Sequence, residues 1–282
     1  MGLPMVKNLL TAGYAVHGMD INPASLSALN GMGGKAFTNA KDACLGADLL
    51  LILVVNASQA KQVLFDSGAI DVLPSGGIVC LMSTCPPAEV EEIAKRVQAT
   101  GRRLIDAPLS GGVVGATNGS LTVMAACDDE TFNDVQDVFK VIGERIFHVG
   151  QEPGQGAMCK TVNQLLCGLH IAVTAEAFSL AKKSGLDLAM LLEIMSGSAA
   201  SSWMLKDRGP RMLESDPIVT SAVDIFVKDL GIVMQAGRDA KAALPLTAAA
   251  YQLFLSSSGR GDGRLDDSQV IRSYDLLNGL GQ

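Results

Sequence analysis

The order of elements along the chain predicts an α/β domain followed by an all-α domain. In residues 1–150, short apolar runs alternate with helical stretches, which is the pattern of a parallel sheet with helices on both faces. From Gly154 to the C-terminus we find long helical patterns and no convincing strand. A chain of 282 residues that is 48% hydrophobic and 18% charged is long enough for two domains with separate cores.

The predicted elements follow one another in a regular order. One helix ends near Gly13 and another begins after Pro23. The predicted strands are residues 15–20, 49–55, 77–82 and 103–106. The predicted helices of the second half are residues 156–184, 187–197, 202–214, 221–240, 244–257 and 267–277. Gly150 and the Pro153-Gly154 pair mark the change of pattern, so we expect the two domains to cover residues 1–152 and 153–282.

Charge and composition exclude several classes of function. The net charge of -7 and the pI of about 5.0 argue against a nucleic acid or an anionic membrane as the principal partner. The six cysteines form no CxxC pair and the three histidines have no partner at ligand spacing, so we expect reduced thiols, a cytoplasmic location and no metal site. The longest apolar run, residues 47–55, is far shorter than the ~20 residues that a membrane span needs, and no signal peptide is visible.

The start of the chain predicts a nucleotide site. Gly2 lies where a glycine-rich turn would enter a helix, and Asp20 ends the next strand. In a Rossmann-type fold the helix start receives a pyrophosphate, and an acid at this strand end binds the adenosine ribose. A carboxylate there repels the extra phosphate of NADP, so Asp20 predicts NAD as the cofactor. The alternative role for Asp20 is a helix cap, for which Asn22 is the better candidate.

The first strand of this nucleotide-binding motif is missing from the chain. That strand and the earlier glycines are expected before residue 1, and Gly2 alone is weak evidence for a phosphate-binding turn. A sheet without its central strand leaves neighbouring backbone groups unpaired. We therefore expect a chain that starts at Met1 to be unstable or to bind NAD poorly.

Lys160 is the candidate catalyst. Lys160, Asn163 and Gln164 fall on one face of the helix predicted for residues 156–184, so an ammonium and two amides could converge on one bound molecule. The helix is apolar almost all round from residue 165 to residue 181. A lysine at its mouth is expected to be partly dry, which lowers the pKa of the amine toward values useful for proton transfer. The alternative is a snorkelling lysine beside two capping amides.

Four motifs, read in order, carry a resemblance to a known family. They are Gly2-Leu-Pro-Met, Asp106-Ala-Pro-Leu-Ser-Gly-Gly112, Lys160-x-x-Asn163 and Phe226-Val-Lys-Asp-Leu230. With these motifs the chain resembles the β-hydroxyacid dehydrogenase family, which includes 3-hydroxyisobutyrate dehydrogenase. Three stretches are more similar to the L-threonate dehydrogenase branch. These are Val54-Val-Asn-Ala57 with Gln59, Asn163-Gln-Leu-Leu with His170-Ile-Ala, and Ala222–Leu230.

The resemblance assigns roles to the first group of site residues. It implies that Lys160 is the general acid/base, and that Ser110, Gly111 and Gly112 hold the substrate carboxylate through hydroxyl and backbone donors. A glycine pair lets the backbone approach an anion closely, which agrees with that role. The alternative is an ordinary turn after the strand at residues 103–106.

The resemblance also implies substrate contacts from the amides and a closing role for Lys228. Asn163 and Gln164 are expected to bind the substrate. Gln164 stands where the family has asparagine and is one methylene longer, which indicates a differently shaped or more polar substrate than 3-hydroxyisobutyrate. Lys228 is expected to close over cofactor and substrate. The alternative for Lys228 and Asp229 is an exposed charge pair on the helix at residues 221–240.

The cofactor residues implied by the resemblance are Val54 and Val55 on the adenosine side and Thr84 beside the nicotinamide. We therefore expect an NAD-dependent enzyme that oxidises a small hydroxy acid, with L-threonate, oxidised at C2 to 2-oxo-tetronate, as the expected substrate. The enzymatic alternatives are a 3-hydroxyisobutyrate dehydrogenase and a reductase of tartronate semialdehyde or glyoxylate. A non-catalytic binding protein is the alternative of another class.

The apolar helix at residues 156–184 predicts a homodimer or homotetramer that buries it.

Overall fold

The computed structural model describes residues 1–280 and divides the chain into two compact units, each with its own hydrophobic core. The first unit is Met1–Lys160 and the second begins at Thr161. The division lies inside helix α9 (Gln155–Lys183), whereas the sequence predicts a boundary before that helix.

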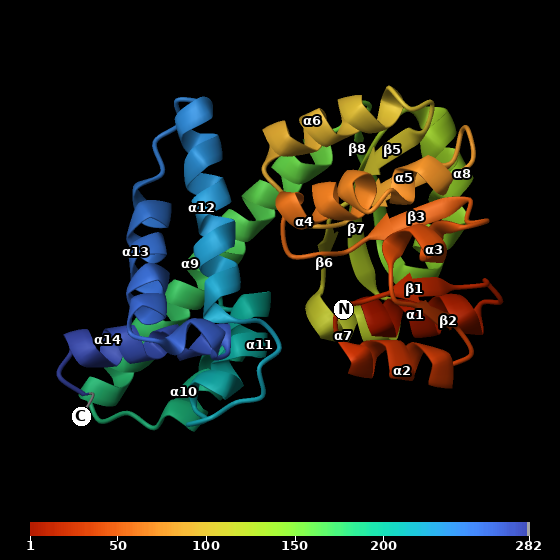
Figure 1. Ribbon diagram of the computed structural model, residues 1–282. Coiled ribbons are helices and arrows are strands. Elements are labelled where there is room, and N and C mark those ends of the chain that lie inside the picture. The colour runs from red at the N-terminus through yellow and green to blue at the C-terminus, as the bar shows by residue number, and fades with distance from the viewer. Residues whose placement is uncertain (281–282) are drawn as a thin grey trace. The chain divides into compact units, whose positions relative to one another are not determined.

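The first unit alternates helices and short strands (Figure 1). In chain order these are α1 (Gly2–Thr11), β1 (His17–Met19), α2 (Pro23–Gly31), β2 (Lys35–Phe37), α3 (Ala40–Cys44), β3 (Leu49–Ile52), α4 (Ala57–Lys61), the π-helical turn η1 (Gln62–Asp66), α5 (Ala69–Val72), β4 (Ile78–Leu81), α6 (Pro87–Gln98), β5 (Arg103–Asp106), β6 (Leu109–Ser110), α7 (Gly112–Asn118), β7 (Leu121–Ala126), α8 (Asp129–Ile142) and β8 (Gly143–Gly150). All four predicted strands are confirmed, as β1, β3, β4 and β5, three of them shortened at their ends.

The main sheet is mixed rather than parallel throughout. Strands β3, β4 and β5 are parallel neighbours, as predicted. Strand β7 runs antiparallel to β5 and β6 on one side and parallel to β8 on the other. Only Ala107 and Pro108 separate β5 from β6, and a parallel crossover needs a dozen or so residues. The two strands therefore follow one another along the same edge of β7 instead of pairing together.

Strands β1 and β2 form a separate parallel pair, with His17 opposite Lys35. Within residues 1–280 no strand joins this pair to β3, the edge of the six-stranded sheet. Helix α2 packs closely on the pair because Gly18 leaves room for Leu29, and a Cβ at Gly18 would lie 2.5 Å from the Leu29 side chain. The chain leaves β1 at Met19, so Asp20 comes directly after the carboxyl end of the strand.

The six-stranded sheet has a hydrophobic cluster on each face, as alternating strand residues require. Val79 and Leu81 of β4 pack into the cluster that contains α4, α5 and α6. Ile78 and Cys80 point the other way, into the cluster formed with α1, α7 and α8. Figure 1 shows these two groups of helices on opposite sides of the sheet.

The second unit is helical in the part of the chain that the structure describes. Beyond α9 it contains α10 (Leu188–Gly197), α11 (Trp203–Met212), α12 (Val223–Asp239), α13 (Pro245–Gly259), the 3-10 turns η2 (Asp262–Arg264) and η3 (Asp267–Val270), and α14 (Ile271–Leu277). These elements confirm the six predicted helices, the last of which begins as η3.

Helix α9 is long and apolar enough to cross a membrane, which differs from the expectation drawn from contiguous apolar runs. Its packing is that of a core helix in the second unit. Ile171, Ala175 and Phe178 are almost fully buried and lie in one cluster with Phe226 of α12 and Phe254 of α13.

A buried ion pair joins α11 to η3 in the same unit. The Arg208 guanidinium contacts both carboxylate oxygens of Asp267, with Nε–Oδ1 and Nη2–Oδ2 distances of 2.8 Å. Burial raises the pKa of Asp267, and the charge of Arg208 partly offsets that rise. The neighbouring Arg211 lies 2.7 Å from Asp266, so two consecutive carboxylates hold the segment before α14 against α11.

Candidate active site

The start of α9 is held by Asp106, the last residue of β5. Its Oδ2 atom accepts hydrogen bonds from the backbone N–H groups of Gly154, at 2.9 Å, and Ala157, at 2.7 Å. N–H groups in the first turn of a helix have no partner within the helix. Gly154 has no side chain to cap them and adopts a φ of 100°. The cap of α9 therefore comes from a strand far away in the sequence.

Gly156 makes this contact possible. A Cβ atom at residue 156 would lie 2.6 Å from the carbonyl oxygen of Asp106 and 2.6 Å from that of Met124. Both oxygens belong to strand backbone, which cannot move aside easily. Any larger residue would push the start of α9 away from β5 and β7.

Asp106 is a buried carboxylate, with 1% of its surface exposed. Burial raises the pKa of Asp106 from 3.8 to about 6, although the N–H groups of Ala157, Gly154 and Gly156 lower it. A raised pKa means that the folded state holds this proton more tightly than the unfolded chain. The stability that this group contributes is therefore fully present below pH 3.8 and is lost as the pH rises through about 6.

Lys160 follows one turn later in the same helix. Only 7% of its surface is exposed, whereas a snorkelling lysine carries its ammonium into water. Positions 156 and 160 lie four residues apart, so Lys160 extends from the helix face that meets β5 and β7. The burial of Lys160 therefore disfavours the snorkelling alternative.

The Ser110–Gly112 segment is a tight turn between β6 and α7. Ser110 ends β6, where it lies opposite Thr122 of β7. Gly111 and Gly112 have φ values of 127° and 61°, which side chains rarely allow. Nothing lies within 4 Å of the place that a Cβ of Gly112 would take. Successive N–H groups in such a turn suit an anion such as a carboxylate.

In the second unit, four polar residues form one chain of contacts. The Gln164 amide donates to Asp229 Oδ2 at 2.5 Å, and Lys228 Nζ lies 2.8 Å from Asp229 Oδ1. Asn163 Nδ2 donates to Gln164 Oε1 at 2.9 Å. Because a carboxylate only accepts, Asp229 fixes the Gln164 amide with its nitrogen toward α12 and its oxygen toward Asn163. Three of the predicted site residues, Asn163, Gln164 and Lys228, are thus brought together.

Asp229 itself was missed by the sequence reasoning. The alternative of an exposed pair with Lys228 is wrong, because Asp229 is only 2% exposed. The sequence did contain a signal for this burial. Residue 229 lies three positions after Phe226 and four before Val233, and both of these α12 residues pack in the core of the second unit. The contact also depends on Gly168 of α9, where a Cβ would lie 2.7 Å from Leu230.

Apart from Lys228, the residues predicted to bind the cofactor lie in the first unit. Asp20 is exposed, and its Oδ1 accepts from the N–H of Asn22 at 2.8 Å. Asn22 caps α2, as expected for the alternative role, so Asp20 is not the cap. Burial lowers the pKa of the Met1 amine, and the charge of Asp20 partly offsets that change. Gly2 begins α1, which has no side-chain cap.

This arrangement fits a dinucleotide, because a carboxylate suits a ribose diol and an uncapped helix start suits a phosphate. Val54 and Val55 follow β3, and Thr84 follows β4. Val54 N–H donates to Ser83 Oγ at 2.8 Å, and Val55 N–H donates to Gln59 at 2.9 Å. Ser83, which the sequence reasoning did not single out, thus fixes the chain after β3 to the chain after β4.

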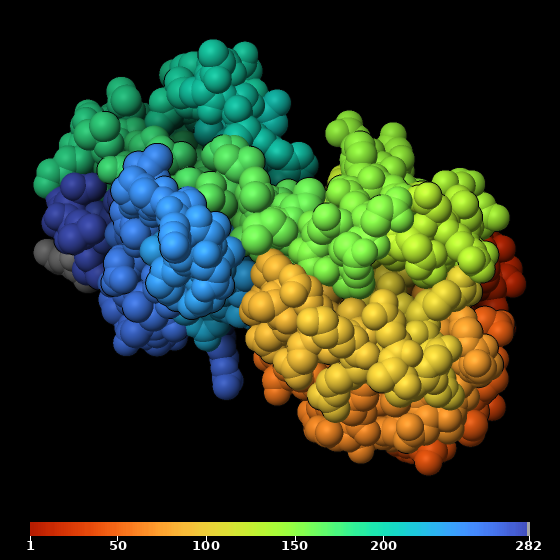
Figure 2. Space-filling model, turned by 90° about the horizontal axis from the view of Figure 1, so that it is seen from above, coloured from red at the N-terminus to blue at the C-terminus, as the bar shows by residue number. Residues whose placement is uncertain are grey.

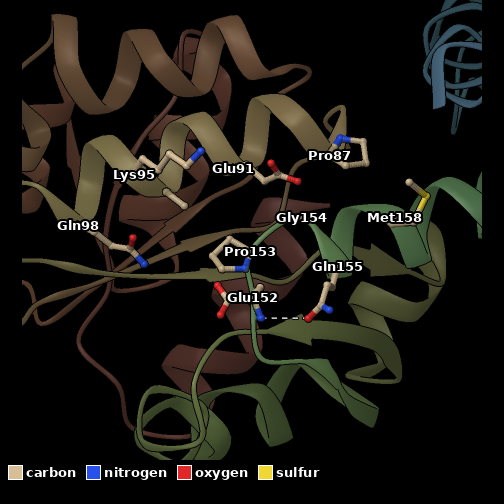
Figure 3. Close-up of a pocket in the computed structure, with 10 residues that line it drawn as sticks. Pro87, Glu91, Lys95, Gln98, Glu152, Pro153, Gly154, Gln155 and Met158 are labelled. Atoms are coloured by element: carbon tan, nitrogen blue, oxygen red, sulfur yellow. Dashed lines mark hydrogen bonds between the residues drawn. The ribbon is translucent and has the colours of Figure 1, made fainter. Parts of the chain in front are cut away.

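A shallow pocket lies beside the start of α9, where Figure 2 shows the yellow residues of α6 next to the green residues that lead into α9. Figure 3 shows Glu91 and Lys95 on α6 at one side of this pocket and Glu152 and Gln155 at the other, with the Glu152 N–H donating to the Gln155 side chain at 3.0 Å. None of the predicted site residues lines this pocket.

Comparisons with known proteins agree along nearly the whole chain. A family profile described as the NAD binding domain of 6-phosphogluconate dehydrogenase matches residues 1–150. A second, described as NAD-binding of NADP-dependent 3-hydroxyisobutyrate dehydrogenase, matches residues 154–274. L-threonate dehydrogenases from Cupriavidus necator and Escherichia coli K12 are each 38% identical over 97% of this chain and 93% and 91% of their own lengths. The crystal structure of a 3-hydroxyisobutyrate dehydrogenase from Salmonella typhimurium is 37% identical, with a TM-score of 0.92 over 96% of this chain and 95% of that one.

Proposed function

Because the chain belongs to the β-hydroxyacid dehydrogenase family, whose members use a nicotinamide dinucleotide to act on hydroxy acids, we propose that it oxidises L-threonate at the C2 hydroxyl to 2-oxo-tetronate with NAD. The observation that carries the mechanism is the buried Lys160 in a helix whose start is fixed by Asp106. The choice of L-threonate as the substrate is based on the L-threonate dehydrogenases among its relatives.

In this proposal Lys160 accepts the proton of the substrate hydroxyl during oxidation and returns it during reduction. A nicotinamide bound in the first unit would supply the hydride acceptor. Ser110, Gly111 and Gly112 hold the substrate carboxylate through a hydroxyl and backbone N–H groups. Asn163 and Gln164 bind the remaining hydroxyls, and the ordered amide of Gln164 favours a polyhydroxy acid over 3-hydroxyisobutyrate.

The proposal assigns residues 1–152 to the NAD-binding domain and residues 153–282 to the substrate and oligomerisation domain. Gly2 and Asp20 bind the pyrophosphate and the ribose, and Val54, Val55 and Thr84 line the cofactor. Lys228 closes over cofactor and substrate. We also propose a cytoplasmic location, supported by six cysteines that form no disulfide within the described residues.

The cofactor choice gives the first test. The parent protein is expected to bind NAD at least about tenfold more tightly than NADP, and Asp20→Arg is expected to erode that preference by removing a repulsive charge and adding an attractive one. Asp137→Arg is the matched control, because it makes the same charge change at an exposed position on α8. Fluorescence titration with both cofactors measures the preference. Equal affinities in the parent, or equal effects of the two variants, contradict the role of Asp20.

Substrate choice is tested on the same preparation by initial rates of NADH formation. L-threonate is expected to give a higher kcat/KM than 3-hydroxyisobutyrate. The reverse reaction is measured with tartronate semialdehyde and glyoxylate. If 3-hydroxyisobutyrate, or either aldehyde in reduction, gives a higher kcat/KM, that compound becomes the assigned substrate in place of L-threonate. The family assignment is unchanged by that result.

A homodimer or homotetramer is the proposed assembly. Helix α10 is largely apolar yet has no buried residue, and its Met190 and Ile194 are 63% and 54% exposed. Val173 and Leu180 of α9, in the same unit, are 56% and 65% exposed. An apolar surface of this extent on a soluble protein indicates a contact with another chain.

Met190→Glu combined with Ile194→Glu is expected to shift the protein to monomers, because two charges would be buried at the contact. Leu246→Glu, at a residue that is 71% exposed on α13, is the control and should keep the parent mass. Light scattering after size exclusion gives the mass. A parent that is already a monomer contradicts the proposed assembly.

A further inference from the structure

We propose that Asp106 is a positioning residue, which sets the place of Lys160 relative to the Ser110–Gly112 turn. The inference rests on the function proposed above, since it concerns the residue assigned there to proton transfer. All the residues involved lie in the first unit, Met1–Lys160.

The first link runs through the Asp106 side chain. One oxygen accepts the N–H of Gly154, just before α9, and the N–H of Ala157 in its first turn, and Lys160 lies three residues after Ala157. A charged acceptor makes stronger hydrogen bonds than a neutral one, by about a factor of two. The carboxylate therefore fixes both the position of α9 along its axis and its rotation about that axis, and with them the turn that carries Lys160.

The second link runs through the main chain. Asp106 pairs with Ala126 of β7, and the next pairs along the same edge are Leu109 with Val123 and Ser110 with Thr122. The register is unbroken between these pairs. The Ser110–Gly112 turn is thus placed by the strand that places Asp106.

The contact between the start of α9 and the strand ends is too close for the helix to shift toward them. Gly156 lies so close to the carbonyls of Asp106 and Met124 that no Cβ fits between them. Ala157 is 3% exposed and packs in the core cluster on the α6 side of the sheet. The helix start is therefore pressed against the strand ends as well as bonded to them.

A purely structural cap would not need this design. Helix α8 begins with an ordinary local cap, in which Asp128 accepts from the N–H of Thr131 at 2.8 Å. Such a cap stays close to water and costs little desolvation. Asp106 is buried, so its charge loses more hydration than the charge of Asp128. It nevertheless joins the start of α9 to the strand that leads to the Ser110–Gly112 turn, and the proposed mechanism requires a fixed distance between these two segments. That cost is explained if the carboxylate serves the geometry of the site.

The experiment compares Asp106→Ala, Asp106→Asn and Asp128→Ala with the parent enzyme. In Asp106→Ala we expect kcat for hydroxy-acid oxidation to fall about 10- to 100-fold, as for a displacement of roughly 1 Å at the reacting atoms. The dissociation constant for NAD should stay close to that of the parent. Asp106→Asn keeps an acceptor in place and should retain most of kcat. Asp128→Ala removes the local aspartate cap of another helix, α8, and should lower the unfolding midpoint while leaving kcat near the parent value.

Amide hydrogen exchange adds a readout that needs no activity. Exchange at residues 154–158 should rise in Asp106→Ala and stay near the parent rate in Asp128→Ala and Asp106→Asn. If kcat falls in both alanine variants in proportion to the unfolding midpoint, or if Asp106→Asn is as inactive as Asp106→Ala, the inference is overturned. Should Asp106→Ala fail to fold, Asp106→Glu replaces it: the carboxylate is kept but displaced, and a parent-like kcat in that variant also overturns the inference.

Lys160→Ala separates the two proposals. A parent-like turnover in Lys160→Ala defeats the proposed function whatever Asp106 does. A large loss in Lys160→Ala together with parent-like kcat in Asp106→Ala defeats only the positioning role.

Discussion

Lys160→Ala is expected to lower turnover by about two to four powers of ten, the range for losing a positioned proton-transfer group. Folding and NAD binding should stay nearly intact, because the change leaves the apolar part of α9 in place. Lys160→Met tests the same point while preserving side-chain volume. Steady-state rates with L-threonate and NAD, together with thermal unfolding, measure both effects.

Lys160→Arg distinguishes proton transfer from mere positive charge. A guanidinium stays protonated and cannot accept the hydroxyl proton, so arginine should not rescue turnover. Lys182→Ala is the control on the same helix, since the Lys182 ammonium pairs with Asp275 at 2.8 Å near the far end of α9. Near-parent turnover in the arginine variant would defeat the mechanism.

Asp267→Ala is expected to cost about 3–5 kcal/mol of folding stability, because it leaves the Arg208 guanidinium buried without its bidentate partner. The double variant Arg208→Met with Asp267→Leu should be far more stable than the single variant, since two apolar side chains of similar size remove both charges together. Denaturant unfolding of each protein gives the free energies.

The matched control for this pair is Asp137→Ala. Lys140 and Asp137 form an exposed pair on α8, with side chains that are 56% and 84% exposed. Its loss should change the stability by less than about 1 kcal/mol. A cost for Asp267→Ala no larger than this control would show that Arg208 finds water or another partner when Asp267 is absent.

Much of the fold could be predicted from local patterns. The helices of the second unit have long apolar stripes and marked ends, and all six were predicted. Four strands, β2, β6, β7 and β8, were missed. Strands β2 and β6 contain three and two residues, too few for a period to be visible. Strand β7 is an apolar run of six residues, and such a run does not distinguish a strand from a buried helix. Its antiparallel direction depends on the short link from β5 to β6.

Among the site residues, too, some positions follow from local sequence patterns and others depend on contacts between distant segments. The spacing of Lys160, Asn163 and Gln164 on one helix face is a local property, so the sequence can predict that they cluster. The role of Asp106 is not local, because its partners lie 48 and 51 residues away. The burial of Asp229 could have been predicted from the periodicity of α12, but its bond to Gln164 required the packing of two helices.

The unbroken register of β5 and β6 along β7 limits how this region can change during evolution. Side chains alternate between the two faces of a strand, so Asp106 and Ser110, four residues apart, occupy the same face. Replacement of Ala107, Pro108 or Leu109 alters packing but keeps that relation. Insertion or deletion of one residue would turn Ser110 to the face opposite Asp106 at a single step. Descendants of this chain can therefore drift in composition between Asp106 and Ser110, but not in length.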